Sequence, residues 1–162
     1  MGAGTASRYL PVIKKYHVAI INREDPVFYR IQKGDLVIIA RGANWQKQVY
    51  FAGIASSDIY SFSKDGIEGD YTIDLTDFVD LQNGPDIPFN KQCSGGASRN
   101  PGAVYQLQGS NDGDSAVIHA VLSVIKQEKE KMLVENIKKV LEQSRNLILT
   151  GAPGTGKSFL AK

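Results

Sequence analysis

Eight residues constrain the fold of this chain more than any others, Gly151-Ala152-Pro153-Gly154-Thr155-Gly156-Lys157-Ser158. Their spacing matches the phosphate-binding P-loop pattern, in which a glycine-rich loop connects a buried strand to a helix. The flanking residues fit that context, because Asn146-Leu147-Ile148-Leu149-Thr150 reads as a short buried strand and Ser158 to Lys162 as the start of a helix. The sequence therefore predicts a strand, a phosphate-binding loop and a helix in this order.

Each residue type in this loop has a chemical reason. Glycines allow the backbone to curl so that successive N–H groups point at phosphate oxygens, and the following helix adds its partial positive charge. We expect the backbone from Gly151 to Gly156 to hold the phosphates, and Lys157 to reach the β and γ phosphates. The Ser158 hydroxyl is expected to complete the coordination of Mg²⁺. The predicted cofactor is GTP or ATP with Mg²⁺.

Hydrolysis requires further groups. An acidic residue on a later strand must hold Mg²⁺, and another group must position the attacking water. The sequence continues for only four residues after Ser158. We therefore expect no catalytic residue here and an inactive, monomeric fragment, with NTPase activity and an oligomeric ring only in the intact protein.

Residues 133–162 resemble the start of the AAA+ domain of McrB-type restriction proteins. Many AAA+ proteins share Gly-Ala-Pro-Gly-Thr-Gly-Lys, so the arrangement of the chain adds to the resemblance. McrB-type subunits carry a variable N-terminal DNA-recognition domain of about this size, then a helical joint, then the motor. The resemblance implies a role in a restriction system, a motor that typically uses GTP, and a separate nuclease subunit as partner.

The region before the motor reads as a compact β-rich domain. Short runs rich in β-branched residues are separated by turn residues, as expected for strands. A long connection with several Pro and Gly residues precedes the last of these runs. The predicted strands cover residues 17–21, 35–40, 49–55, 71–75 and 103–107.

Part of this region also has a resemblance of its own. Residues 31–39, with Lys33-Gly34-Asp35 before a strand, and Phe51-Ala52-Gly53-Ile54-Ala55 are similar to the pattern of PUA-like domains of the EVE and YTH type. The resemblance implies an α+β fold in which a small β-barrel with flanking helices holds a pocket for a modified base turned out of the DNA helix. Some McrB-type proteins carry such modules.

A helical region follows the β-rich one. Apolar residues recur at spacings of three and four from Val117 to Ile125, and Asp114 is the predicted N-cap. The charged residues 126–131 either continue this helix or mark a joint before a second apolar set at Leu133, Ile137, Val140 and Leu141. We predict a recognition domain over residues 1–125, followed by a helical linker and the truncated start of the AAA+ domain over residues 126–162.

Two segments contain candidate DNA contacts. Trp45 lies between Arg41 and Lys47 in a turn-like segment, where an aromatic ring beside positive charge suits a nucleic acid. A tryptophan covering the end of a barrel is the structural alternative. In the glycine-rich segment 95–102, Arg99 is a candidate for a phosphate and Asn100 for a base edge, although the segment also fits an ordinary surface connection.

Other features bound the possible functions. Cys93 is the only cysteine, which excludes an intramolecular disulfide and favours a cytoplasmic protein, and no run approaches the roughly 18 apolar residues of a membrane span. His17 and His119 lie on apolar segments and are expected to pack.

The charged residues are unevenly distributed along the chain. Eight basic residues lie between Arg8 and Lys47, and eight acidic ones between Asp58 and Asp86. This segregation fits either a nucleic-acid-facing side or two solvated surfaces.

Two rival functions remain open from the sequence. The P-loop motif does not indicate which molecule the motor acts on. The N-terminal domain is therefore alternatively the substrate-binding domain of a AAA+ chaperone or remodelling ATPase. A further alternative is that the N-terminal domain binds RNA, as other PUA-like proteins do. A preference for duplex DNA over RNA would argue against this alternative.

Overall fold

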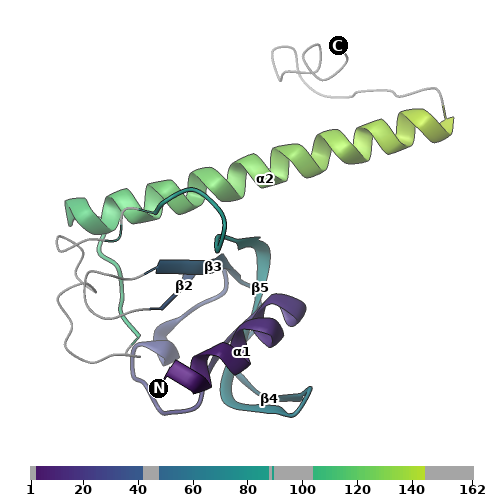
Figure 1. Cartoon of the computed structure of the whole chain (residues 1–162). Helices are drawn as coiled ribbons and strands as arrows, with labels where there is room; N and C mark the ends of the chain where they lie inside the picture. The colour runs from purple at the N-terminus through teal and green to yellow at the C-terminus, as the bar shows by residue number, and fades with distance from the viewer. Residues whose placement is uncertain (1–2, 42–47, 88, 90–103, 145–162) are drawn as a thin grey trace. The chain divides into compact units, whose positions relative to one another are not determined.

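The computed structural model describes residues 3–41, 48–87, 89 and 104–144. Within these ranges the chain is α+β, with one antiparallel sheet and helices packed on it (Figure 1). The predicted α+β class is thus confirmed. The elements are α1 (Ala3–Tyr16), β1 (Val18–Ile21), the 3₁₀ helix η1 (Phe28–Arg30), β2 (Leu36–Arg41), β3 (Gln48–Ala55), β4 (Tyr60–Lys64), β5 (Ile67–Asp80) and α2 (Asp112–Ser144).

The chain divides into two compact units, residues 1–125 and residues 126–162. The first unit contains the whole sheet, α1, η1 and the part of α2 that ends at Ile125. The charged residues 126–131 lie inside α2, so the helix continues through them and no joint between two helices forms there. In the second unit, the apolar residues Met132, Leu133, Val140 and Leu141 are exposed.

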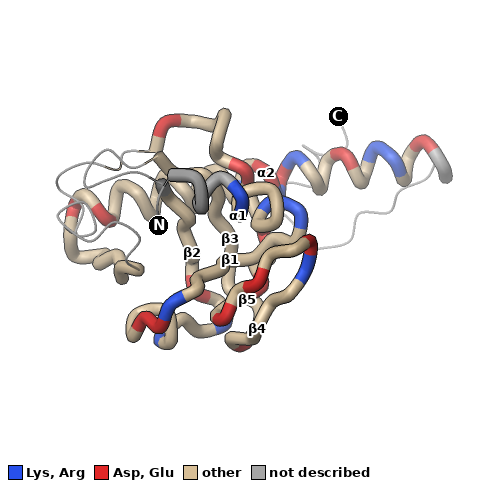
Figure 2. The backbone as a smooth tube through the Cα atoms, turned by 60° about the horizontal axis from the view of Figure 1, so that its bottom comes forward, with Lys and Arg blue, Asp and Glu red and all other residues tan. Residues whose placement is uncertain are grey.

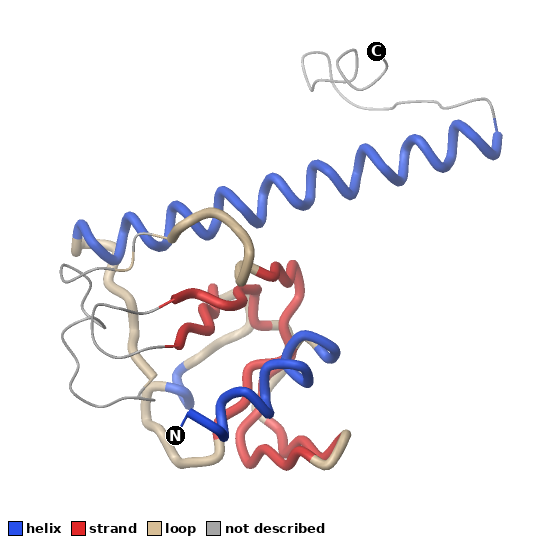
Figure 3. The backbone as a smooth tube through the Cα atoms, in the orientation of Figure 1, coloured by secondary structure: helices blue, strands red, loops and turns tan. Residues whose placement is uncertain are grey.

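The long strand β5 organises the sheet. All its neighbours are antiparallel, and the strand order is β1-β5-β3-β2, with β4 paired to the first half of β5. Figure 3 colours the strands red and the helices blue. Thr72 pairs with Ile20 of β1 on one side and with Tyr60 of β4 on the other, whereas residues 75–80 pair with β3. Strand β5 therefore changes its pairing partners along its length, and the sheet curls into a half-barrel.

A bulge in β5 gives the sheet its bend. Asp77 has a φ of 50°, and two residues of β5, Asp77 and Phe78, stand opposite the single residue Gly53 of β3. A bulge of this kind increases the local twist and bends its strand. A Cβ at Gly53 would lie 2.9 Å from the Leu75 Cβ and 3.0 Å from the Thr76 carbonyl oxygen, so the strands approach closely only because residue 53 has no side chain.

Gly53→Ala is accordingly expected to lower the free energy of unfolding by about 1–3 kcal/mol, because the new methyl group meets backbone and Cβ atoms that cannot move independently. Urea denaturation of both proteins measures this change. Gly109→Ala is the matched control, since a Cβ there meets nothing within 4 Å and the substitution should not destabilise the protein. Equal destabilisation by the two substitutions would contradict the proposed role of Gly53.

The core of the first unit lies on both faces of the curled sheet. On one face Val117, Val121 and Ile125 of α2 pack against Val49 and Val79 of the sheet. The other face carries two further clusters, one of which includes Val12 and Ile13 of α1 and the other Phe28 of η1. Partly buried Ile39 and Phe78 pack against both of these clusters, which makes the covered face continuous.

A tight hairpin joins β4 and β5. Its two connecting residues, Asp65 and Gly66, have φ values of 53° and 68°. Two consecutive left-handed residues define a type I′ turn, whose twist matches that of the strands, and Asp-Gly is a preferred sequence for it. Neither β4 nor helix α1 was predicted from the sequence.

The start of α2 differs from the prediction. The Asn111 side chain, and not that of Asp114, caps the helix, because Asn111 Oδ1 accepts the Asp114 N–H at 3.0 Å. Asp114 is fully buried, and its Oδ2 accepts the Gln108 N–H at 2.8 Å. The predicted Asp114 cap was therefore wrong by one helical turn, and Asp114 instead fastens the preceding turn to the helix.

The predicted strand over residues 103–107 is also wrong for the part that the structure describes. Residues 104–108 form no strand. Val104 packs against the cluster on the Phe28 side, whereas Leu107 packs against the α2 cluster. The apolar residues of this segment thus pack against two different clusters without pairing in a sheet.

Candidate functional site

Most residues predicted to bind ligands lie outside the described residues. This applies to the whole P-loop, Gly151 to Ser158, and to Trp45, Lys47, Arg99 and Asn100. Arg41 is the last residue of β2 and pairs with Gln48 of β3, so residues 42–47 connect two adjacent antiparallel strands. The predicted position of Trp45 and Lys47 between two strands follows from these bounds.

Ion pairs join the basic and acidic stretches of the first unit. Lys14 pairs with Asp80 at 2.7 Å, and Lys33 pairs with Asp58 at 3.0 Å. The Lys15 ammonium lies 2.7 Å from Asp65, at the tip of the β4–β5 hairpin. Figure 2 shows Lys and Arg interspersed with Asp and Glu along the first unit. The charges that are segregated in the sequence are thus partly brought together by the fold.

These contacts also shift two carboxyl pKa values. The hydrogen bond from Lys15 lowers the pKa of Asp65. Partial burial acts to raise the pKa of Asp80, but hydrogen bonds from Lys14 and Gln82 outweigh it, and the net effect is a lowered pKa. Both carboxyls therefore favour the folded state while they are ionised, and this contribution is lost as the pH falls through their folded-state pKa values.

Strand β5 carries several acidic residues. Asp74, Asp77 and Asp80 lie in a strand, with Asp77 in the bulge. Asp74 accepts a hydrogen bond from the Tyr60 hydroxyl at 2.6 Å. Burial and this hydrogen bond raise the pKa of Tyr60. The described residues contain no group of three His, Cys, Asp or Glu side chains placed to hold a metal ion.

Both histidines were expected to pack, and of the two His17 has a ring contact within the described residues. His17 and His119 are both exposed. The His17 ring stacks on Phe78, with centroids 4.3 Å apart and planes 7° from parallel, and Phe78 in turn lies 5.3 Å from Phe51. His17 has a φ of 51° and forms the one-residue connection between α1 and β1, which explains how an exposed ring comes to cover the partly buried Phe78.

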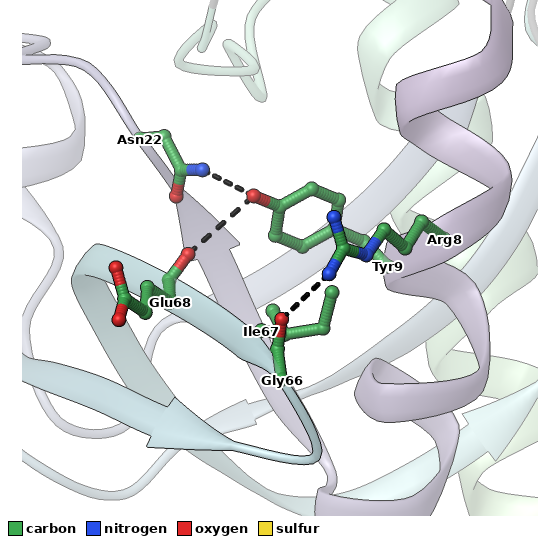
Figure 4. A pocket seen from close by; sticks show the side chains of 6 residues that line it. All are labelled: Arg8, Tyr9, Asn22, Gly66, Ile67 and Glu68. Carbon is green, nitrogen blue, oxygen red and sulfur yellow. Dashed lines mark hydrogen bonds between the residues drawn. The ribbon is translucent and has the colours of Figure 1, made fainter.

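A polar pocket of about 260 Å³ lies between α1, the end of β1 and the β4–β5 hairpin (Figure 4). Arg8 Nη2 donates to the Gly66 carbonyl oxygen at 2.8 Å. The Tyr9 hydroxyl accepts a hydrogen bond from Asn22 Nδ2 and donates to the Glu68 carbonyl oxygen at 3.4 Å. These bonds tie three distant segments together and fix the pocket's shape. We call it the α1–hairpin pocket; its lining residues are Arg8, Tyr9, Asn22, Gly66, Ile67 and Glu68.

Sequence reasoning missed this pocket entirely. Its residues come from three segments that are separated by 12 or more positions, and no segment alone carries a recognisable binding motif. Asp65-Gly66 was the one usable signal, because that dipeptide between two apolar alternations predicts a hairpin. A second, smaller pocket of about 190 Å³ lies where β3 begins, between Gln48 and the turn at Gly84 and Pro85.

Among the described residues, no helix combines the length and apolar character required to cross a membrane. Comparison of the chain with protein-family models, with curated proteins and with solved structures found no match. Its function is therefore argued from its own residues.

Proposed function

We propose that this chain is the DNA-recognition part of a McrB-type restriction subunit, joined to a P-loop that binds GTP or ATP with Mg²⁺. The sequence Gly151–Ser158 carries the proposal, because it combines the glycine spacing, Lys157 and Ser158 with a strand pattern before it and a helix pattern after it. In the intact protein, binding of modified DNA would be coupled to the nucleotide-driven motor and to a separate nuclease subunit.

The first unit is assigned to DNA recognition as a PUA-like module. A curled antiparallel sheet with helices packed on it is compatible with this class. The connection between β2 and β3 would place Trp45 at one end of the sheet, next to Arg41 and Lys47. A base turned out of the helix needs an aromatic wall to replace its lost stacking, and Trp45 is the residue that we assign to this role.

The charge of the first unit limits how it would bind DNA. Residues 1–125 contain 11 Lys and Arg against 13 Asp and Glu, a formal charge of −2. Phosphate contacts supply most non-specific DNA affinity, so such a unit must bind through a local group of basic residues. We assign this group to Arg41, Lys47 and Arg99, with Asn100 at a base edge.

A second candidate is the substrate-binding domain of a AAA+ chaperone or remodelling ATPase. The net negative charge favours it, together with the pairing of Lys14, Lys15 and Lys33 with aspartates, since neither leaves a broad basic face for DNA. The first unit would bind a protein partner without any phosphate contacts.

Nucleotide binding tests the part of the proposal that both candidates share. The full-length gene product should bind a fluorescent GTP or ATP analogue in the presence of Mg²⁺, with weaker binding when EDTA removes the metal. Competition by unlabelled GTP and ATP would identify the preferred base. Absence of binding at millimolar nucleotide would contradict the assignment of Gly151–Ser158 as a P-loop.

A further inference from the structure

The second half of α2 carries an apolar stripe of its own, Leu133, Ile137 and Leu141, which we call the second stripe. We propose that the second stripe is the docking surface for the next apolar segment of the same chain, Leu147-Ile148-Leu149. Surface and occupant both belong to the second unit. The proposal depends neither on nucleotide binding nor on DNA binding.

The second stripe does not continue the apolar face that packs in the first unit. In that unit the buried residues of α2 repeat every four positions, at Val117, Val121 and Ile125. Steps of three and four beyond Ile125 lead mostly to polar residues, namely Lys129, Met132, Asn136 and Lys139. The core of the first unit therefore does not account for the second stripe.

The second stripe is apolar and yet lacks a cover. Leu133 is 51% exposed and Leu141 is 39% exposed, while Ile137 between them is half-buried. Among the described residues, the hydrophobic clusters of the protein do not include these three side chains. The other side of this part of the helix is charged and exposed, with Lys131, Glu135, Lys138 and Glu142. Helices of this amphipathic kind pack their apolar side against another element.

The sequence that follows α2 supplies a matching cover. The helix ends at Ser144, and the next apolar residues, 147–149, lie outside the described residues. Two residues separate them from the helix, and connections of two to six residues are usual between a helix and a strand. Three extended residues span about 10 Å, which is about the rise of seven helical residues. Folded back from Ser144, the segment would thus run alongside Leu141 and Ile137.

A second copy of the chain fits this surface less well. Each partner of a stable interface buries about 800 Å², and three aliphatic side chains on about two helical turns offer less than that. A segment tethered two residues from the helix, in contrast, loses little translational freedom when it docks. Alternate side chains of an extended segment share one face, so Leu147 and Leu149 would pack on α2 together.

Methyl NMR of the 162-residue chain tests this docking. We expect nuclear Overhauser contacts from methyl groups of Leu147 or Leu149 to those of Ile137 or Leu141, in a sample that remains monomeric in analytical ultracentrifugation. Mixed samples of differently labelled copies distinguish the two occupants. Contacts that occur only between copies would identify a dimer and overturn the proposal, and absence of contacts between these methyl groups would overturn it as well.

A matched pair of substitutions tests the stripe itself. Ile137→Gln removes an apolar side chain but keeps a residue that favours helix. We expect it to abolish the contacts between Leu149 and Leu141 and to move the Leu149 methyl shifts towards those of an unstructured chain. Glu135→Gln, on the charged side of the helix, should change neither. Contacts that persist in Ile137→Gln, or equal effects of the two substitutions, would contradict docking on the second stripe.

Discussion

In the proposed intact protein, Lys157→Ala is expected to weaken binding of the Mg²⁺ nucleotide about 10- to 100-fold. In the proposed P-loop, the sequence pattern assigns Lys157 to the position from which a lysine reaches the β and γ phosphates. Hydrogen bonds to charged groups contribute about 1.5–3 kcal/mol, and each 1.4 kcal/mol corresponds to tenfold in affinity. Titration with a fluorescent nucleotide analogue measures the change.

Lys162→Ala is the matched control for this substitution. It removes the same charge five positions further along, outside the P-loop pattern, and should leave nucleotide affinity within about twofold. Comparable losses in the two variants would mean that only the general positive charge matters. Such a result would contradict the specific phosphate contact assigned to Lys157.

Phe51→Ala is expected to lower the free energy of unfolding of the first unit by about 3–5 kcal/mol. Phe51 has no solvent-exposed area, and its ring lies 5.3 Å from that of Phe78 at an interplanar angle of 30°. It also pairs with Ile39 of β2 and Asp80 of β5, so it sits in β3 at the centre of the curl. Removal of the ring leaves a cavity that neither neighbouring strand can close.

Urea denaturation followed by circular dichroism measures this loss. Met132→Ala provides the control, because Met132 is 62% exposed and its truncation should change stability by less than about 0.5 kcal/mol. A loss below about 1 kcal/mol in Phe51→Ala would show that the ring is not enclosed as described. The curled sheet would then lack the core on which its form depends.

The strands that sequence reasoning found were those with strong local signals. The runs that became β1, β2 and β3 are short and rich in β-branched residues, and each is bounded by turn residues. Helix α1 escaped prediction because it contains Pro11, and because Gly4, Thr5 and Ser7 near its start have weaker helical preference. Strand β4 is exposed at four of its five positions, so it has little apolar pattern.

The errors arose where tertiary contacts overrode local pattern. Residues 103–107 have the composition of a short strand, yet residues 104–108 form none, and Val104 and Leu107 pack against different clusters. Asp114 is a good N-cap residue type, but Asn111 lies one turn earlier and takes that position, which frees Asp114 to hold Gln108. No local rule distinguishes these two outcomes, because both depend on where the preceding segment packs.

The candidate sites show the same contrast. The proposed P-loop is a contiguous sequence whose residue types each have a chemical reason, so it can be proposed from eight residues. The α1–hairpin pocket, in contrast, combines Arg8, Asn22 and Glu68 from three segments, and only the topology of β1 and β5 brings them together. The pairing of Lys14 and Lys15 with aspartates was likewise unreadable before the fold was known.

The central claim, that the first unit reads modified DNA, is tested most directly by fluorescence anisotropy with this chain. Matched duplexes with and without a modified cytosine or adenine would be compared at several salt concentrations, because phosphate contacts make affinity salt-dependent. The account predicts tighter binding to one modified duplex, and a loss of about tenfold in Trp45→Ala through lost stacking. Absence of DNA binding even at low salt would contradict it and favour a protein-binding domain on the same motor.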